Sequence, residues 1–535
     1  MHHKYFAFVA ATLLACSCTH NTPKANDTDS EADTLTAAEP ERIIPLEEQF
    51  LPDTIFPSVE SVTFVVDHAD TLPAPLKDLD DRYADSPNVM AFRKNLLRNA
   101  DFGGTVEGTP DTIEVAWRFD TDNDQRETKF GRWGGGTGWS GQPVYVRWSA
   151  DDMAAFRASS PGLTDDFDDE EIFIGSLCNK VYFINYKTGK PSRTPIDVTN
   201  VVKGSMSLDP ELKNLYVGQG VPHSNPFGNL VIDLLAHERT QQFDRDPKAW
   251  RGWGAFDSSP IVAGGYLFWA GENGSLYKYE RSQGSLRRIS TLRYRVRGAA
   301  PGIESSICVY RNYGYFGDNH GNILCVNLNT MNPVWYYYNH DDTDGTIVCR
   351  EEQGTPYLYT ACEIDKQGTD ATCYFVKLNG LTGECVWEQR IPCRQLTIGE
   401  KHFDGGMYCT PLLGTGDADG LIFANICQDS RTGNKGELLA LHTADGSIAY
   451  AVPYPTWAWS SPVAFHNERR EMFIFTGDSH GNAYIIRATT GEVLYRQRIG
   501  NNFESSPIVV GNTAVVGSRG NGIYKMVIRQ RDTNP

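Results

Sequence analysis

Positive charge is scarce in this chain of 535 residues, in which 49 Lys and Arg face 67 Asp and Glu and give a formal net charge of −18. No stretch gathers enough basic side chains to neutralise a phosphate backbone, so we expect no nucleic acid partner. Beyond the N-terminal segment, no apolar run reaches the length that a membrane-spanning helix needs. These two shortages exclude a nucleic-acid-binding protein and an internal transmembrane helix.

The cysteines lack the spacings of the common metal and redox motifs. Twelve Cys occur, but none forms the C-x-x-C pair of zinc sites and thioredoxin-like proteins, and no C-x-x-C-H haem-attachment motif occurs. An exported location would permit disulfides, although the spacing reveals no pairing. The sequence therefore predicts neither a zinc site nor a c-type haem.

A targeting segment begins the chain. The apolar run from Tyr5 to Ala15 follows Lys4 and is too short to span a bilayer. Leu13-Leu14-Ala15-Cys16 resembles a bacterial lipobox, in which the cysteine is diacylated and becomes the mature N-terminus. An ordinary secretory signal with an incidental cysteine is the alternative. We expect residues 1–15 to be a lipoprotein signal peptide and Cys16 to anchor the protein to the outer membrane, facing the periplasm or the cell surface.

Two segments separate the anchor from the rest of the chain. Residues 16–42 are polar and acidic, and they offer too few apolar side chains to offset the entropy of ordering, so we expect a disordered tether. Residues 43–110 form an extension to which the sequence assigns no role. Within it, Val62–Val66 favours a strand, and Ser86-Pro87 before residues 88–99 predicts a capped helix.

The remainder of the chain, residues 111–535, is built on a repeat. In its clearest copy, Phe256–Val262, Gly265–Gly271 and Ser275–Tyr279 carry the aromatic and β-branched residues typical of strands, and Asn273-Gly274 suits a hairpin turn. The copies are spaced by 40 to 65 residues, with these residues at the position of Ser259: Gln142, Ser207, Ser259, Ser306, Thr346, Gly406, Ser461 and Ser506. The pattern predicts an all-β, eight-bladed β-propeller with four-stranded blades.

Several copies end in a second motif, a Thr-Gly or Asp-Gly turn followed by a strand that carries an aromatic residue, as in Lys377–Trp387. We expect this aromatic to dock between neighbouring blades. The motif resembles the quinoprotein-like (PQQ-like) β-propeller repeat, over roughly residues 111 to 529. Thr112–Phe119 resembles a fourth strand, with Trp117 at the docking position. We therefore expect this N-terminal strand to complete the last blade beside Ile523–Ile528 and to close the ring.

The resemblance bears on function as well as on fold. Quinone-dependent dehydrogenases of the family typically carry adjacent cysteines, calcium ligands and a catalytic Asp, whereas this sequence has no adjacent cysteines and no block that matches the cofactor site. We therefore expect no catalytic residue, no metal and no cofactor. The lipobox and the repeats are instead similar to the lipid-anchored propellers of the outer-membrane β-barrel assembly machinery (BamB-like).

These observations predict a non-catalytic, lipid-anchored scaffold of the cell envelope that binds protein partners, with the β-barrel assembly machinery as the candidate partner. Two alternatives stay open. One is a surface lipoprotein that binds a glycan or a small ligand, and the other is a PQQ-dependent dehydrogenase.

Two groups of residues are candidates for binding. The first lies two residues before the repeat anchors, where we expect one mouth of the central channel, and consists of Asp257, Glu304, Asp344, Asp404, Trp459 and Glu504. Like charges in a confined mouth would attract a cation or a basic peptide, although each acid could instead accept hydrogen bonds from the turn of its own blade. The second is an aromatic loop whose composition is typical either of an interface or of packing between blades: Trp250, Arg251, Trp253 and Phe256.

Overall fold

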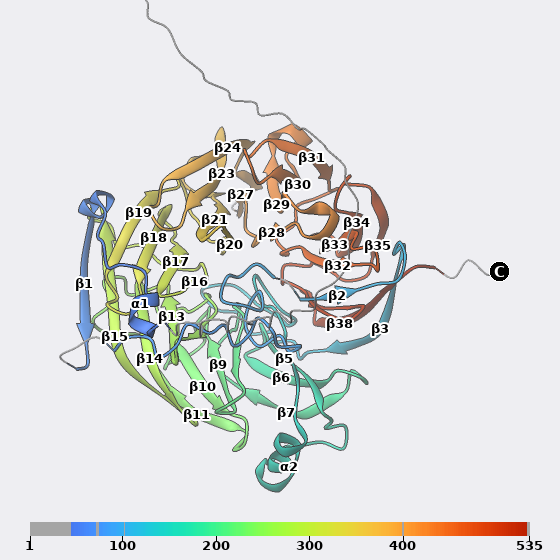
Figure 1. The fold of residues 1–535 in the computed structure, drawn as a ribbon. Coiled ribbons are helices and arrows are strands. Elements are labelled where there is room, and N and C mark those ends of the chain that lie inside the picture. Colours follow the sequence, from blue (N-terminus) through green and yellow to red (C-terminus); the bar gives the residue numbers. More distant parts are fainter. Residues whose placement is uncertain (1–43, 71–73, 101, 399–400, 532–535) are drawn as a thin grey trace, which may run out of the picture. The chain divides into compact units, whose positions relative to one another are not determined.

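The computed structural model describes residues 44–70, 74–100, 102–398 and 401–531. The chain divides into the units Met1–Pro45 and Leu46–Pro535, and the second unit is a ring of antiparallel sheets (Figure 1). Cys16, the predicted signal peptide and the predicted tether lie outside the described residues, so the division of the chain into these segments stays a prediction. Among the described residues, no helix has the length and apolarity needed to cross a membrane.

Most sheets consist of four strands that follow one another along the chain, and two of these sheets gain a further strand from the N-terminal extension. The sheets are β4 (Val144–Arg147), β5 (Glu170–Gly175), β6 (Lys180–Asn185) and β7 (Pro191–Asp197); β8 (Ser207–Asp209), β9 (Asn214–Gly218), β10 (Asn229–Asp233) and β11 (Glu238–Gln242); β12 (Ile261–Ala263), β13 (Tyr266–Gly271), β14 (Ser275–Ser282) and β15 (Ser285–Val296), extended by β1 (Val62–His68); β16 (Cys308–Tyr310), β17 (Tyr313–Gly317), β18 (Asn322–Asn327) and β19 (Pro333–Tyr338); β32 (Val463–His466), β33 (Met472–Gly477), β34 (Asn482–Arg487) and β35 (Val493–Arg498), extended by β2 (Gly104–Thr105); and β36 (Ile508–Val510), β37 (Thr513–Gly517) and β38 (Gly522–Arg529) with β3 (Thr112–Asp120).

A ten-stranded sheet contains the two expected blades between residues 348 and 453, which are joined where Cys393 pairs with Asp429. Its strands are β20 (Val348–Glu352), β21 (Thr355–Ala361), β22 (Glu363–Ile364), β23 (Ala371–Asn379), β24 (Cys385–Cys393), β27 (Gly405–Gly406), β28 (Leu412–Leu413), β29 (Leu421–Asp429), β30 (Lys435–His442) and β31 (Ile448–Pro453). The predicted propeller architecture is confirmed. The count of eight blades stays a prediction, because these two expected blades form one sheet.

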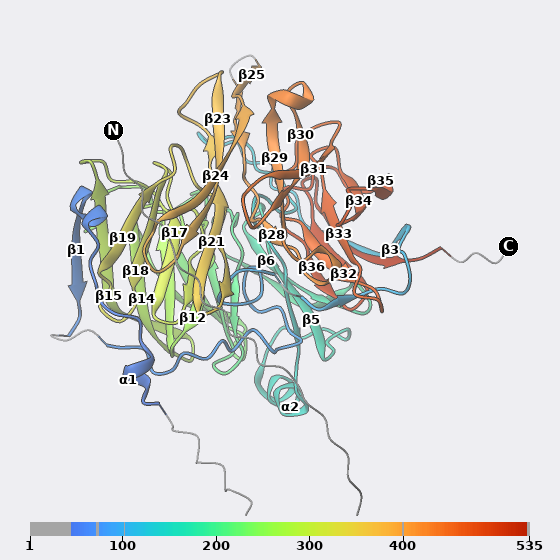
Figure 2. The same ribbon diagram turned by 45° about the horizontal axis from the view of Figure 1, so that its top comes forward.

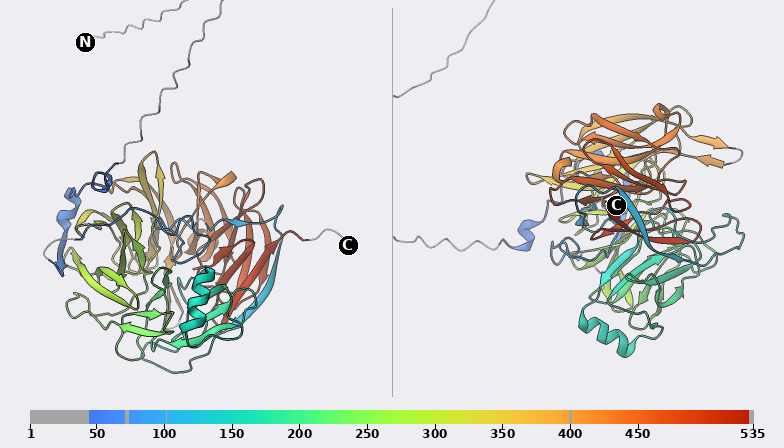
Figure 3. Two further views of the ribbon diagram at one scale, coloured as in Figure 1. Left: turned by 60° about the horizontal axis from the view of Figure 1, so that its bottom comes forward. Right: turned by 90° about the vertical axis from the view of Figure 1, so that its right-hand side faces the viewer.

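The helices and a small hairpin lie outside the sheets of the ring. They are α1 (Leu46–Gln49), α2 (Ala150–Ser159), the 3₁₀ turns η1 (Pro57–Ser61), η2 (Gly416–Ala418) and η3 (Ser430–Thr432), and the hairpin of β25 (Leu396–Ile398) and β26 (Lys401–Phe403). The strand β25 projects beyond the other strands of its side (Figure 2). In the edge-on view the hairpin and α2 lie on opposite sides of the ring (Figure 3).

The N-terminal strand closes the ring as predicted. β3 pairs antiparallel with β38 from Thr112 opposite Arg529 to Asp120 opposite Gly522. The last sheet therefore takes three strands from the C-terminus and one from the N-terminal part of the chain, so its otherwise free edge is hydrogen-bonded.

The predicted docking of fourth-strand aromatics is also confirmed. The indole nitrogens of Trp117, Trp335 and Trp387 each donate to a backbone carbonyl that follows the third strand of the next expected blade, at 2.9 Å in every case. The turn glycine Gly383 has a φ of +76°, and a Cβ there would lie 2.7 Å from the Trp335 ring. Glycine is needed at this turn because it allows both the left-handed backbone and the close approach of the ring.

The predicted helix over residues 88–99 is wrong. This segment is irregular, and Arg93 and Arg98 have φ values of 54° and 55° that a right-handed helix does not allow. The segment crosses the middle of the ring (Figure 1). We call residues 88–100 the channel segment. By contrast, the predicted strand at Val62–Val66 is confirmed as part of β1, which pairs with β15.

Hydrogen bonds to the innermost strands explain why the channel segment is not helical. The backbone N–H groups of Leu208, Val309 and Cys349, from three different sheets, donate to carbonyls of residues 90, 96 and 97 at 2.7–2.9 Å. The fully buried Arg98 donates to the carbonyls of Ile307 and other residues around it. A helix over residues 88–99 would use the carbonyl of residue 90 internally, whereas the ring needs all three carbonyls to satisfy its own buried N–H groups.

Candidate functional site

The predicted channel-mouth acids are not one ring of equivalent carboxylates. Asp257 forms an ion pair with Lys203, and Glu504 forms one with Arg519, with Nε and Oε2 2.7 Å apart. Asp404 accepts a hydrogen bond from a glutamine side chain. The other two acids, together with Asp257, belong to two clusters that lie in adjacent parts of the ring.

Each cluster contains three carboxylates, one oxygen of each lying within 4.8 Å of one oxygen of the other two. The first, called the Lys203 cluster, consists of Asp257, Glu272 and Glu304. The second, called the Asp344 cluster, consists of Asp342, Asp344 and Glu363. The sequence analysis identified half of these residues and missed Glu272, Asp342 and Glu363.

A signal for one of the missed residues exists in the repeat itself. Glu272 directly follows the second strand of its sheet, and Asp318 and Asp478 occupy the same place after β17 and β33. Asp318 accepts from the backbone of its own hairpin turn and from the hydroxyl of Tyr294 at 2.7 Å, and Asp478 accepts in the same way from its own turn and from Tyr484. The position is therefore structural in two sheets, while Glu272 turns toward other carboxylates.

Positive charge accompanies the Lys203 cluster. Burial raises the pKa of Glu272 well above its usual range, and the neighbouring charges of Glu304 and Asp257 add to the effect, while Lys203 and Arg251 oppose it. Burial alone would lower the pKa of Lys203, but the surrounding carboxylates outweigh it and raise that pKa. The Lys203 cluster is therefore a network of buried acids stabilised by basic side chains of the protein itself.

The Asp344 cluster has far less positive charge. The side-chain atoms Asp342 Oδ1, Asp344 Oδ1 and Glu363 Oε2 are buried and have no hydrogen-bond partner among the described residues, and the three residues are only 5–7% exposed. The nearest basic group, Lys366 Nζ, lies 3.7 Å from Asp342, is about half exposed, and lies closer to Asp365 at 2.8 Å. Three carboxylates thus converge with one shared, exposed countercharge.

The pKa values of the Asp344 cluster reflect this shortage of countercharge. Burial raises the pKa of Asp342 to about 7, with the charge of Glu304 adding to the rise. Burial, followed by the charge of Asp342, raises the pKa of Asp344 well above its usual range, and the same two causes act on Glu363. Near neutral pH such a site holds protons or a cation.

Aromatic side chains line the channel beside this cluster. Trp459, the remaining predicted channel-mouth residue, stacks on Tyr408 with ring centroids 4.9 Å apart. Both line a cavity of about 10 Å³ together with Trp139, Asp344 and Phe92 of the channel segment. An indole and a phenol therefore lie in the same small cavity as the Asp344 carboxylate.

The predicted aromatic loop mainly packs within the protein. Phe256 is a core residue, 5.6 Å from Trp269 between ring centroids. Trp253 packs edge-on against two phenylalanines, and Trp250 lies under the guanidinium of an arginine on β15. Arg251 acts electrostatically on the Lys203 cluster. Partner binding by this loop stays a prediction.

No family model and no curated protein matches this chain. Its fold is similar to that of the quinohemoprotein alcohol dehydrogenase of Pseudomonas putida, at a TM-score of 0.57 and 14% identity over 87% of this chain and 84% of that one. It is also similar to the quinohemoprotein alcohol dehydrogenase of Comamonas testosteroni, at a TM-score of 0.57 and 12% identity over 85% of this chain and 82% of that one. A europium-containing methanol dehydrogenase is similar at a TM-score of 0.58 and 13% identity over 83% of this chain and 91% of that one. These likenesses show a PQQ-like β-propeller fold.

The comparisons correct the expected function. The prediction of a non-catalytic scaffold in outer-membrane protein assembly is wrong, because these structural neighbours are alcohol and methanol dehydrogenases. The structure of BamB from Moraxella catarrhalis reaches a TM-score of only 0.45, so the BamB-like resemblance is not confirmed. At 12–14% identity the dehydrogenases share the fold with this chain, and they do not show that it is an enzyme.

The cavity beside Trp459 is too small for a quinone, and the Asp344 cluster offers donors for a cation. The channel cavity of about 10 Å³ beside Trp459 has room for one water molecule at most, far too little for a planar tricyclic cofactor. The adjacent cysteines that the family typically places against the quinone are absent. In contrast, the carboxylate oxygens of the Asp344 cluster are the donors that Ca²⁺ prefers.

Proposed function

We propose that this propeller binds a hard cation, Ca²⁺ or a trivalent lanthanide, at the Asp344 cluster. The observation that carries the proposal is the convergence of three buried carboxylates, each of which has an oxygen without a hydrogen-bond partner within the described part of the chain. Leaving several ionised carboxylates together in a buried site is costly unless a cation or protons neutralise them. A bound cation satisfies all three acids at once.

The spacing of the acids suits such an ion. Ca²⁺ binds oxygens at about 2.3–2.6 Å, so two ligands on opposite sides of one ion are about 5 Å apart. The three candidate oxygens of the Asp344 cluster lie within 4.8 Å of one another, and one ion can therefore contact all of them. Bidentate binding by the three carboxylates, together with one water molecule, would supply the six to eight oxygens that Ca²⁺ takes.

The choice of a hard cation also has support from a protein of the same fold. One of the structural neighbours is described as a europium-containing methanol dehydrogenase. Lanthanide ions prefer oxygen donors, as Ca²⁺ does, and Tb³⁺ luminesces strongly when an excited aromatic ring close to it transfers energy. Trp459 and Tyr408 line the same cavity as Asp344, which makes Tb³⁺ a direct probe of this site.

The test is a titration of the purified protein with Tb³⁺, with excitation of tryptophan. We expect saturable luminescence that Ca²⁺ competes away, and a loss of roughly tenfold or more in affinity in Asp344→Asn. The matched control is Glu272→Gln, which removes one carboxylate from the Lys203 cluster and should leave the titration unchanged. No sensitised luminescence in the wild type, or equal affinity in Asp344→Asn, would contradict the proposal.

We further propose that acyl chains on Cys16 hold the protein at the outer membrane. The support is the sequence Leu13-Leu14-Ala15-Cys16 after a short apolar run. Intact-mass analysis of protein from a bacterial envelope should give the mass of residues 16–535 plus acyl chains. A mature N-terminus at any other residue contradicts this anchor.

A further inference from the structure

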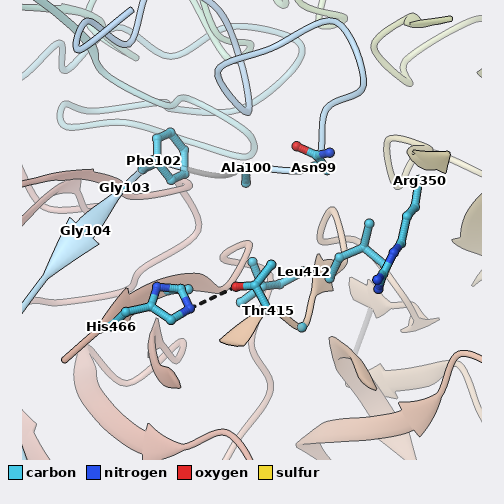
Figure 4. A pocket seen from close by; sticks show the side chains of 12 residues that line it. Asn99, Ala100, Phe102, Gly103, Gly104, Arg350, Leu412, Thr415 and His466 are labelled. Carbon is cyan, nitrogen blue, oxygen red and sulfur yellow. Dashed lines mark hydrogen bonds between the residues drawn. The ribbon is translucent and has the colours of Figure 1, made fainter. Parts of the chain in front are cut away.

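A second cavity lies away from both carboxylate clusters, where the channel segment leaves the ring. It has a volume of about 190 Å³. Its walls come from Asn99, Ala100 and residues 102–104 of the extension, from Arg350 on β20, from Leu412–Thr415 at β28, and from β32. Figure 4 shows Arg350 and His466 on opposite sides of this cavity, with Phe102 and Asn99 on the side of the extension.

The extension is built into this wall. β2 pairs parallel with β32, with Gly104 opposite Phe465. A Cβ at Gly104 would lie 2.4 Å from Val509 Cγ1 and 2.9 Å from the carbonyl of Ala464, so only glycine lets the two strands approach this closely. The cavity is therefore formed by ordered, paired backbone from distant parts of the chain.

The lining combines an apolar floor with polar groups at its ends. Ala100 and Leu412 are buried and belong to one hydrophobic cluster, against which Phe102 packs. The hydroxyl of Thr415 is hydrogen-bonded to His466 Nε2 at 2.9 Å (Figure 4). Such a lining suits a small molecule with an apolar body and a polar end.

The guanidinium of Arg350 defines the polar end. Its Nη2 contacts Asp419 Oδ1 at 2.6 Å, but the Asp419 side chain is 60% exposed and that of Arg350 is 31% exposed. Such exposed pairs are weak, because water solvates both partners. A carboxylate inside the cavity can replace Asp419 and form two parallel hydrogen bonds with the guanidinium.

We propose that this cavity binds a small organic monocarboxylate, with its carboxylate on Arg350 and its apolar body against Phe102 and Leu412. The volume of about 190 Å³ is below that of pockets for drug-sized ligands, so the ligand is a small aromatic or branched-chain acid. The inference is independent of the cation proposed for the Asp344 cluster.

The probe is benzoate, with benzyl alcohol as its uncharged counterpart, followed by calorimetric titration at constant ionic strength. We expect benzoate to bind the wild type in the millimolar range or tighter and Arg350→Gln roughly tenfold more weakly, since a charged hydrogen-bond donor is lost. Arg487→Gln is the matched control, because Arg487 pairs with Glu492 at similar exposures of 23% and 59% but lies outside the cavity.

A second variant excludes a loss that comes merely from misfolding. Asp419→Asn removes the nearer of the two carboxylates that pair with Arg350, the other being Glu352 at 4.0 Å, and should tighten benzoate binding, an outcome that damage to the fold cannot produce. Weak binding of benzyl alcohol to all variants completes the expected pattern. Absence of benzoate binding, equal affinity in Arg350→Gln, or no gain in Asp419→Asn overturns the proposal.

Discussion

The two carboxylate clusters occupy corresponding places in the repeat and differ in their charge balance. Asp257 and Asp344 each lie two residues before a repeat anchor, and each is joined by a glutamate that follows a second strand. In the Lys203 cluster a basic side chain lies directly on Asp257, whereas in the Asp344 cluster the nearest ammonium is half exposed and shared with Asp365. The countercharge therefore determines whether an acid at this backbone position forms an internal ion pair or is left for a cation or protons.

The largest effect is expected from Lys203→Met. It leaves Asp257 buried without its ion-pair partner, and removing one member of a buried pair typically costs about 3–5 kcal/mol. Urea denaturation in a chelator should show this loss. If charge balance alone separates the clusters, Ca²⁺ should restore much of the lost stability of this variant by occupying the vacated position. If Lys203→Met is as stable as the wild type in chelator, the ion pair with Lys203 is not what stabilises the buried Asp257.

The second prediction concerns stabilisation by Ca²⁺. A ligand that binds only the folded state stabilises it by about 2.7 kcal/mol at a concentration of 100 times Kd. Thermal melts should therefore shift upward with Ca²⁺ in the wild type and in Glu272→Gln. Asp344→Asn should show about half of this shift or less, because it lacks one of the three converging carboxylates and a tenfold weaker affinity leaves only about 1.4 kcal/mol at the same concentration. Equal shifts of the melting temperature in Glu272→Gln and Asp344→Asn would show that Ca²⁺ binds outside the Asp344 cluster.

The third prediction concerns pH in the absence of a cation. The pKa of Asp342 is raised to about 7 in the folded protein, above its value of about 3.9 in an unfolded chain. The folded state thus binds more protons in this window, so the free energy of unfolding should fall as the pH rises from about 4 to about 7. Asp342→Asn should flatten this dependence, measured by urea denaturation at several pH values, and saturating Ca²⁺ should flatten it in the wild type. A wild type whose stability rises over this window would contradict protonation of the cluster.

The smallest effect is expected at a third acid of the channel mouth. Glu504 pairs with Arg519, whose side chain is 30% exposed, and such partly exposed pairs contribute less than about 1 kcal/mol. Arg519→Gln should therefore lower the free energy of unfolding far less than Lys203→Met in the same assay. If Arg519→Gln loses as much free energy of unfolding as Lys203→Met, the loss depends on how deeply the carboxylate is buried and not on how exposed its basic partner is.

The propeller fold follows from patterns in the amino-acid sequence. Strands, turns and the closing strand at Thr112 are encoded by patterns within one repeat, and the docking aromatics such as Trp335 recur at a fixed place in it. These features are local and repeated, so the strands and turns predicted in one copy support the same prediction in the others. The function expected from the resemblance was wrong, because a shared fold carries no site of its own.

The channel segment and the composition of the clusters depend on contacts that form only in the folded ring. Ser86-Pro87 is a helix-start signal, but N–H groups of strands far along the chain hold the carbonyls of residues 90, 96 and 97 in an irregular segment. Lys203, before β8, meets Asp257, before β12, through the way neighbouring sheets pack around one channel. Which acid meets a basic partner depends on distances between side chains that are remote in sequence, and electrostatic energy in a buried site depends steeply on those distances.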